Sequence, residues 1–332
     1  MKNIKVNLLT LIVHLTSSIS IARLKEIINS INKQTSHNFS LLFLFDGCSQ
    51  SIVNEASNTS KSKKNINVNY AFFSEELGSA YAFNYAFKKI ETPYGYYFGS
   101  SIILKKNFVA TIIKYLKKIK NTDLLNFYLN KSSSMPSIPL SEIKSFSSDF
   151  SIRFVYVTNN CIFSKQFLEK NNILQINFRN YLLQFYPDII KCKPKWYRIN
   201  EQLVEYTYEK NVSYNIFDLY DQCIPILEKM QIKNTFEYKH RVEVEYLCIV
   251  YLLHKFLVTI FKNCSKKHNM QKKAIDFVVQ TINTYIPNWF KNKWLKSKYN
   301  KNNKKLLLYL KKFKPYRFYV KQAIRSGIFN EK

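Results

Sequence analysis

Residues 6–47 read VNLLTLIVHLTSSISIARLKEIINSINKQTSHNFSLLFLFDG, and this stretch decides the fold. The part from Val6 to Leu15 is an almost unbroken apolar run, which is typical of a strand buried on both faces. From Ile21 to Asn32 the apolar residues recur three and four positions apart, which predicts an amphipathic helix. A second apolar run, LLFLF from Leu41 to Phe45, ends at Asp46-Gly47. Strand, helix and strand in this order predict the start of an α/β domain with a mostly parallel sheet.

The same alternation of apolar runs and helical periodicity continues along the chain. We expect further strands at 68–72 and 95–98, helices at 80–90 and 107–119, and a loop or frayed helix at 49–64. The segment 120–151 is rich in Ser, Pro and Lys, which predicts a loop over a cleft. Beyond it we expect a helix at 162–171, a strand at 197–208, and helices at 216–230, 242–261 and 274–285.

Composition bounds the class of protein. The chain has 332 residues, 46% of them hydrophobic and 16% aromatic, so it can bury a sizeable core and is not a disordered chain. Its 51 Lys and Arg against 22 Asp and Glu give a net charge of +29, which favours anionic partners such as nucleic acid, membrane or phosphorylated small molecules. The alternative is a solvated basic surface, because abundant Lys, Asn, Ile, Phe and Tyr with only 5 Gly are typical of proteins encoded by AT-rich genomes.

Cysteine and histidine patterns exclude several kinds of site. The six cysteines form no C-x-x-C pair and the five histidines have no metal-ligand spacing, so neither a disulfide framework nor a zinc site is expected. The histidines, His14 among them, are isolated in sequence and are interpreted as structural. The apolar stretch 246–261 is interrupted by His254 and Lys255, and no transmembrane helix is expected. These features are consistent with a cytoplasmic location.

The C-terminal segment 287–332 is the most basic part of the chain, with 14 Lys and Arg and one acid. Aromatic residues are interleaved with this charge, beginning with Trp289, Phe290 and Trp294. Basic residues bind anionic lipids and aromatic rings settle at the membrane interface, so the segment predicts a peripheral contact with an anionic membrane surface. Nucleic acid is the less favoured partner, because no recognition motif accompanies the charge. A solvated basic helical end remains the third reading.

Short motifs at the predicted strand ends carry a family resemblance. Four of the five glycines, Gly47, Gly78, Gly95 and Gly99, stand beside strand ends. The segments in question are LKEIINSINKQTSHNFSLLFLFDGCS, EELGSAYAFNYAFKKIETPYGYYF, NNCIFSKQFLEKNNI, FYPDII and INEQLVEYTYEKNVS. In order and spacing this series resembles the family 2 glycosyltransferases, which have the GT-A nucleotide-sugar fold, over roughly residues 5–215.

The resemblance implies a domain organisation and a function. A GT-A-like α/β domain at 1–225 would hold a nucleotide-sugar half (1–120) and an acceptor half (121–225), followed by a helical basic C-terminal region (226–332). The implied activity is transfer of a sugar from a nucleotide sugar, with a UDP-sugar as the expected donor, to a lipid or polysaccharide acceptor with inversion. The alternative is a catalytically degenerate glycosyltransferase-fold protein that binds at the membrane surface.

The resemblance also assigns residues. Asp46 matches the acid that contacts the nucleoside, although an Asp before Gly is also common in turns. Gly78 and Asn84 match the glycine and asparagine that shape the donor loop. Asp188 aligns with the general base that accepts the acceptor's proton, although Pro187 replaces the usual Glu and an Asp can simply begin a helix.

The chain lacks the metal-binding motif of the family that it resembles. The family's Asp-x-Asp holds Mg²⁺ or Mn²⁺, whereas this chain has Gly99-Ser100-Ser101, with Ser101 left among the donor-contacting residues. The family's pyrophosphate-binding arginine is replaced by Phe83. A metal-independent site could use Lys105 and Lys106 to neutralise the diphosphate, although both lysines also suit a solvated face.

Overall fold

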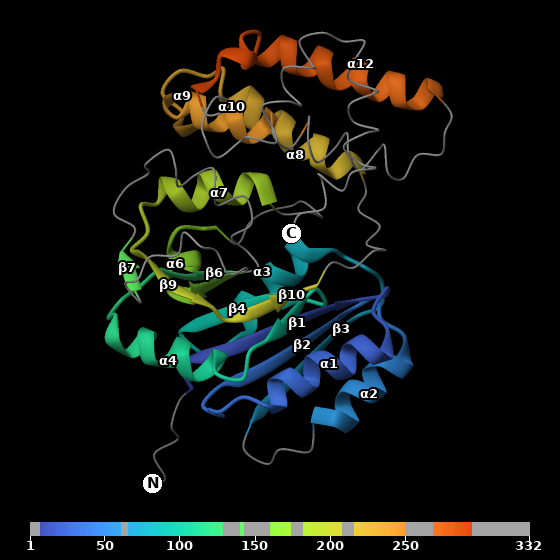
Figure 1. The fold of residues 1–332 in the computed structure, drawn as a ribbon, viewed down its shortest axis with the longest axis vertical. Coiled ribbons are helices and arrows are strands. Elements are labelled where there is room, and N and C mark those ends of the chain that lie inside the picture. Colours follow the sequence, from blue (N-terminus) through green and yellow to red (C-terminus); the bar gives the residue numbers. More distant parts are fainter. Residues whose placement is uncertain are drawn as a thin grey trace. The chain divides into compact units, whose positions relative to one another are not determined.

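The chain folds into two compact units, one formed by Met1–Ser145 with Tyr156–Ser213 and the other by Phe146–Val155 with Tyr214–Lys332. The structure is a computed structural model, shown in Figure 1. It describes residues 7–60, 66–128, 140–142, 160–173, 182–207, 216–249, 252 and 268–293.

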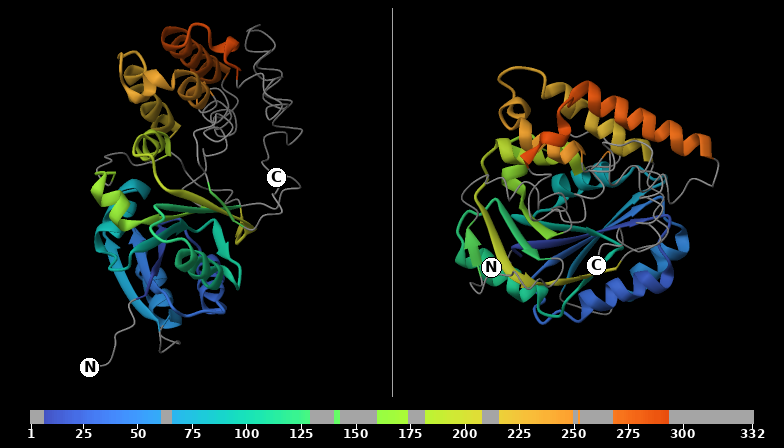
Figure 2. Two further views of the ribbon diagram at one scale, coloured as in Figure 1. Left: turned by 90° about the vertical axis from the view of Figure 1, so that its left-hand side faces the viewer. Right: turned by 45° about the horizontal axis from the view of Figure 1, so that its top comes forward.

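Unit 1 consists of a sheet with helices on its faces, seen from two further directions in Figure 2. Its strands are β1 (Leu9–Thr16), β2 (Ser40–Asp46), β3 (Asn67–Phe73), β4 (Tyr94–Gly99), β5 (Ile102–Leu104), β6 (Leu124–Tyr128), β7 (Leu140–Glu142), β8 (Cys161–Ser164), β9 (Trp196–Gln202) and β10 (Val204–Tyr206). Its helices are α1 (Ile21–Asn32), α2 (Gln50–Ser60), α3 (Ser79–Lys89), α4 (Phe108–Lys118), α6 (Lys165–Lys170) and α7 (Leu182–Lys191).

The main sheet has eight strands in the order β3-β2-β1-β4-β8-β6-β9-β7. β1, β2, β3 and β4 are all parallel, and so is the pair β6–β9. β8 runs antiparallel between β4 and β6, and β7 runs antiparallel to β9. The prediction of a mostly parallel sheet is therefore confirmed. Because β2 and β4 flank β1 on opposite sides, the strand order reverses beside β1.

The core of unit 1 lies between one face of this sheet and the helices α1, α2 and α4, which Figure 1 shows on the same side. Alternate residues of β1 and β2, such as Leu11 and Phe43, point into this layer and are fully buried. Helix α1 begins after the N-cap Ser20, whose side chain accepts a hydrogen bond from the amide of Arg23. α3 contacts β1 and β2 on the opposite face.

Most of the predicted helices and strands are confirmed, and the elements that the sequence did not predict are short strands. The segment 162–171 is wrong as a single helix, since it begins as β8 and continues as α6. The segment 120–151 is wrong as a continuous loop, since it contains β6, which pairs with β8 and β9. The segment 49–64 contains α2.

Unit 2 is helical in its described residues. It holds α8 (Ile216–Lys229), α9 (Phe236–Lys239), α10 (Arg241–Ile249), α12 (His268–Tyr285) and the 3-10 turn η3 (Trp289–Lys291). Thr235 caps α9 by accepting a hydrogen bond from the amide of Tyr238. Gln231, just after α8, donates to the carbonyl of Tyr285 at the end of α12, over 3.1 Å. Within the described part of the chain, no helix is both long enough and apolar enough to cross a membrane.

The first residues of the basic C-terminal segment belong to the packed part of unit 2. Trp289 is 8% exposed, so its interpretation as a membrane-facing aromatic residue is wrong. Asn292 is also buried and donates to the carbonyl of Val242 in α10, over 2.7 Å. The rest of the segment, from Trp294 onward, lies outside the described residues, so its membrane contact stays a prediction.

We predict that Trp289→Ala destabilises unit 2, because it removes a large buried ring. The loss of burial and the cavity left behind should lower the free energy of unfolding by about 3–5 kcal/mol. Urea denaturation followed by circular dichroism measures this change. Lys291→Ala, at an exposed position two residues further on, is the control and should change stability little. Equal effects of the two substitutions would contradict the packing of Trp289.

Candidate functional site

The Asp46 carboxylate, at the end of β2, is the centre of a cluster at the carboxyl edge of the parallel strands. The residue is fully buried. Its Oδ1 accepts a hydrogen bond from the amide of Leu77 over 2.7 Å, and its Oδ2 accepts one from the amide of Gly78 over 3.0 Å. Oδ2 also lies 2.9 Å from Nε2 of His14 in β1. Both carboxylate oxygens are thus used within the protein, and the residue ties β1 and β2 to the loop before α3.

The hydrogen bonds keep this buried acid charged. Burial alone raises the pKa of Asp46, but the hydrogen bond from His14 and those from the Leu77 and Gly78 amides lower it, and the net direction is down. Because a charged carboxylate only accepts hydrogen bonds, Nε2 of His14 is the donor in this pair.

The beginning of α3 is bound to three strand ends. Besides the bonds from Asp46, Ser17, just after β1, donates to Oε2 of Glu76 over 2.9 Å. The Tyr97 hydroxyl on β4 donates to the carbonyl of Ser79, the first residue of α3, over 3.1 Å. The loop and the first turn of α3 are therefore held against β1, β2 and β4 together.

Two glycines make this turn possible. Gly78 is the N-cap residue of α3 and has φ 92° and ψ 165°, a conformation that only glycine adopts without strain. Gly47 has φ 68°, and a Cβ added there would lie 2.9 Å from the backbone nitrogen of Glu76. The structure thus places Gly78 directly before α3, and its role in a donor loop stays a prediction.

The turn after β4 has a donor set that does not suit a divalent cation. The Arg23 guanidinium donates from Nε to the carbonyl of Ser100 over 2.6 Å, and it also binds Glu26 and the hydroxyl of Thr207. The carbonyl of Ser101 accepts from the amide of Thr207 over 2.9 Å. Across the described ranges, no group of three or more His, Cys, Asp or Glu could hold a metal ion. A cation here would also meet a positive guanidinium, so the residues present do not fit the metal that the resemblance implies.

Phe83, in the place of the family's arginine, is part of an aromatic cluster. The residue is fully buried on α3, and its ring lies 5.3 Å from Tyr97, 5.5 Å from Phe163 and 5.4 Å from Phe185, all in edge-on contacts. The side chain that stands in place of the arginine is therefore packed against other aromatic rings. Asn84 follows it on α3 and is half-buried.

Lys105 and Lys106 do not belong to the Asp46 cluster. The carbonyl of Lys105 accepts from Nε2 of Gln34, and that of Lys106 accepts from the amide of Thr35. Gln34 and Thr35 follow the C-terminal end of α1, whereas Ser100 binds Arg23 in the first turn of this helix. The strand β5 lies between Ser101 and Lys105, and at ~3.3 Å per residue it separates them by roughly 13 Å. This placement does not favour a role in neutralising a diphosphate.

Asp188 is on α7, where it is half-buried. It lies in the interior of this helix, so the alternative reading that Asp188 begins a helix is wrong. A chain of ring contacts leads from the Asp46 cluster to α7. His14 stacks on Tyr97 at 5.6 Å, Tyr97 meets Phe83, and Phe83 meets Phe185 of α7.

Sequence reasoning missed the roles of His14, Arg23 and Tyr97. His14 was interpreted as isolated, yet it is bonded to Asp46, which lies 32 residues further along the chain. The available signal was the position of a polar His in an otherwise apolar strand that precedes Asp46 by one strand–helix unit. Nothing in the spacing of Arg23 connects it to Ser100 or Thr207.

Comparison with known proteins identifies the fold. No protein-family model and no curated protein matches the chain. Among solved structures, S. aureus TarS 1–349 in complex with UDP-GlcNAc is 15% identical with a TM-score of 0.64, covering 96% of this chain and 92% of that chain. The same protein with UDP gives 16% identity and a TM-score of 0.59, with 96% and 91% covered. The mannosyltransferase PcManGT from Pyrobaculum calidifontis, in complex with GDP-Man and Mn²⁺, gives 8% identity and a TM-score of 0.51, with 97% and 88% covered. The chain has the GT-A glycosyltransferase fold that the sequence predicts.

We predict that Asp46→Asn removes a pH-dependent part of the stability. The folded pKa of Asp46 is below its unfolded value of about 3.9, so its contribution is present above that pH and is lost as the pH falls through the folded pKa. The wild type should therefore be the more stable protein at pH 7, and the difference should shrink below about pH 4. Urea denaturation as a function of pH measures both curves.

The control for this prediction is Glu75→Gln. Glu75 lies in the same loop, is exposed, and loses the same charge on substitution. Its stability curve should follow that of the wild type throughout the pH range. A gap between wild type and Asp46→Asn that is independent of pH would contradict the charged state of Asp46.

Proposed function

We propose that the protein transfers a sugar from a nucleotide sugar, with a UDP-sugar as donor, to a lipid or polysaccharide acceptor with inversion at the anomeric carbon. The fold supports this proposal, because similar solved chains hold UDP-GlcNAc, UDP or GDP-Man. The proposed location is cytoplasmic, with a peripheral contact to an anionic membrane surface through the basic segment 287–332, in which the buried Trp289 takes no part in the contact.

The observation that carries the proposal is the position of the Asp46 cluster. In open α/β sheets, ligands bind outside the carboxyl ends of the strands, where the strand order reverses. Here the order reverses beside β1, and the cluster is formed by β1, β2 and the loop before α3. Asp46 lies on β2, and Gly99 of β4 is in register with His14 of β1.

We infer that the donor lies across this edge. Both carboxylate oxygens of Asp46 accept hydrogen bonds from the loop Leu77–Gly78. We therefore propose that Asp46 positions this loop and that the loop contacts the nucleoside. The diphosphate would face the first turn of α3, which has no acidic residue and carries the positive end of the helix dipole. Asn84 and Ser101 are proposed as further donor contacts.

Asp188 is proposed as the general base. In an inverting transfer, the base takes the proton of the acceptor hydroxyl while that oxygen attacks the anomeric carbon and the nucleoside diphosphate leaves from the opposite face. The ring contacts between Phe83 and Phe185 fix α7 on the side of the sheet that carries α3. Half-burial of Asp188 suits a carboxylate that must meet an acceptor.

A second candidate function is a glycosyltransferase-fold protein that binds a nucleotide sugar without transfer. The observation in its favour is the turn after β4, where Ser100 and Ser101 replace the metal-binding acids and Arg23 occupies the Ser100 carbonyl. Neither function uses a metal step at this turn.

We predict that UDP or a UDP-sugar raises the melting temperature of the protein to the same extent with Mn²⁺ and with EDTA. A ligand that binds only the folded state must stabilise it, and the donor set at Ser100 and Ser101 does not fit a cation. Thermal melting with UDP, UDP-GlcNAc and GDP-Man, each with Mn²⁺ or EDTA, measures the shift. No shift with any nucleotide would overturn both candidate functions.

We predict that Asp188→Asn abolishes transfer, lowering kcat at least 100-fold, and leaves the UDP-induced melting shift intact. Release of UDP from the stabilising donor, in the presence of membrane lipid or glycan acceptor fractions, measures turnover. Lys191→Gln, an exposed position one turn along α7, is the control and should keep full activity. Binding without release of UDP by the wild type favours the second candidate function, and unchanged turnover in Asp188→Asn would remove Asp188 as the base.

A further inference from the structure

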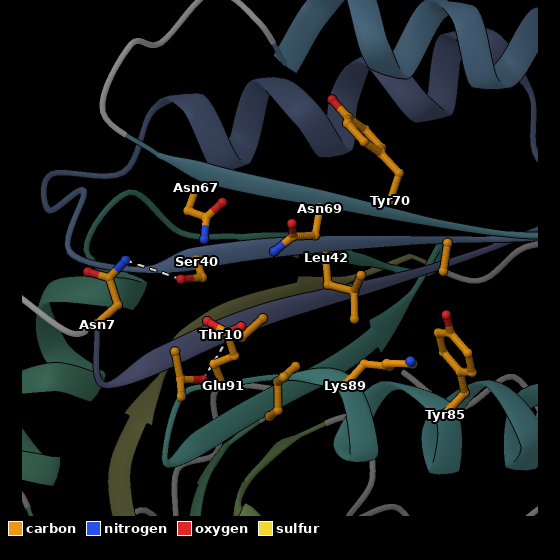
Figure 3. Close-up of a pocket in the computed structure, with 13 residues that line it drawn as sticks. Asn7, Thr10, Ser40, Leu42, Asn67, Asn69, Tyr70, Tyr85, Lys89 and Glu91 are labelled. Atoms are coloured by element: carbon orange, nitrogen blue, oxygen red, sulfur yellow. Dashed lines mark hydrogen bonds between the residues drawn. The ribbon is translucent and has the colours of Figure 1, made fainter.

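A hollow lies at the end of the parallel strands opposite to the Asp46 cluster. It is a groove of about 480 Å³ between β1–β3 and the C-terminal half of α3 (Figure 3). Thr10 lies in its floor, near the start of β1, whereas Asp46 is in register with Thr16 at the end of that strand. At ~3.3 Å per residue the two places are roughly 20 Å apart. The groove is therefore separate from the proposed donor site.

The floor of the groove is polar where a sheet under a helix is usually apolar. Thr10, Ser40 and Asn67 are in register across β1, β2 and β3, so their side chains form a row on one face. Asn69 extends the polar surface along β3. Asparagine is depleted in strands, and two of them on the same face of β3 have no packing role to explain them. This face becomes apolar only further along, as at the fully buried Ile12.

The hydroxyls of the floor are fixed, and the two carboxamides are available. Thr10 and Thr92 share a 2.6 Å hydrogen bond, and Asn7 donates to Ser40 over 3.2 Å. Asn67 and Asn69 are exposed, and their side chains make no hydrogen bond to another residue that the structure describes. Each carboxamide offers donors and an acceptor to a ligand.

The wall of the groove adds aromatic surface and a balanced charge. Tyr85 and Lys89 reach over the groove from α3, with the Lys89 ammonium 5.8 Å from the centre of the Tyr85 ring (Figure 3). Among the described residues, Tyr70 of β3 is the other aromatic residue that lines the groove. Glu91, two residues after Lys89, also lines the groove and matches the charge of Lys89, so the groove has no excess charge.

We propose that this groove binds a neutral oligosaccharide. Sugar hydroxyls require donors and acceptors together, which the carboxamides of Asn67 and Asn69 provide. The apolar faces of sugar rings pack on aromatic side chains, which Tyr85 provides. A polyanion is disfavoured because Lys89 and Glu91 cancel. The role of the groove rests on the proposed function, because the bound oligosaccharide would be an acceptor or product glycan held away from the site of transfer. The binding of an oligosaccharide to the groove does not depend on that function.

The test is direct binding of glycans to the full-length protein without nucleotide. An array of neutral and acidic linear oligosaccharides identifies binders, and calorimetric titration then compares wild type, Asn67→Ala/Asn69→Ala and Asn29→Ala. Both asparagines of the groove are exposed, so the double variant should fold, and Asn29, an exposed asparagine on α1, is the matched control. We expect a neutral oligosaccharide to bind about tenfold or more weakly to the double variant and equally to the control. UDP binding should be the same in all three proteins.

Three results would overturn the proposal: no neutral oligosaccharide binds the wild type, an acidic oligosaccharide binds more tightly than every neutral one, or the double variant binds as the wild type does. Glycan binding in a protein that fails to bind any nucleotide would instead remove the proposed function and leave the groove as a glycan site.

Discussion

The buried charge of Asp46 is the constraint on which the rest of the carboxyl edge depends. A carboxylate removed from water must be matched by hydrogen bonds, and here the donors are His14 and the amides of Leu77 and Gly78. These donors come from β1 and from the loop before α3. The bonds that satisfy the charge therefore also determine where α3 begins, and the positive φ of Gly78 lets the chain turn into the helix at this point.

Aromatic packing on the α3 face connects this edge to the helix that carries Asp188. His14, Tyr97, Phe83 and Phe185 form a continuous series of ring contacts from β1 to α7. In the resemblance, the position of Phe83 carries an arginine that holds pyrophosphate. In this chain a buried ring occupies that position and contacts α7, and the first turn of α3 carries the positive end of the helix dipole beside Gly78.

The apolar pattern of the sequence predicts best those helices and strands in which apolar residues recur at a regular spacing over many residues. α1 was expected at 21–32 and is found at Ile21–Asn32, because its apolar stripe and the Ser20 cap specify both the face and the start. β6 and β8 were missed because strands of five and four residues are too short for a period to be read. Their strand geometry comes from pairing with each other and with β4, which is a long-range interaction.

The sequence by itself determined the α/β order of the chain, because apolar periodicity is a local signal. The GT-A fold was expected from the family resemblance of an ordered series of short motifs, and the same resemblance pointed to Asp46, Gly78 and Asp188 as the residues to examine. Only the tertiary structure decided that His14 pairs with Asp46, that Lys105 and Lys106 lie at the far end of α1, and that Trp289 is buried in unit 2. Each of these depends on strand register or helix packing between residues distant in the chain, which no local pattern encodes.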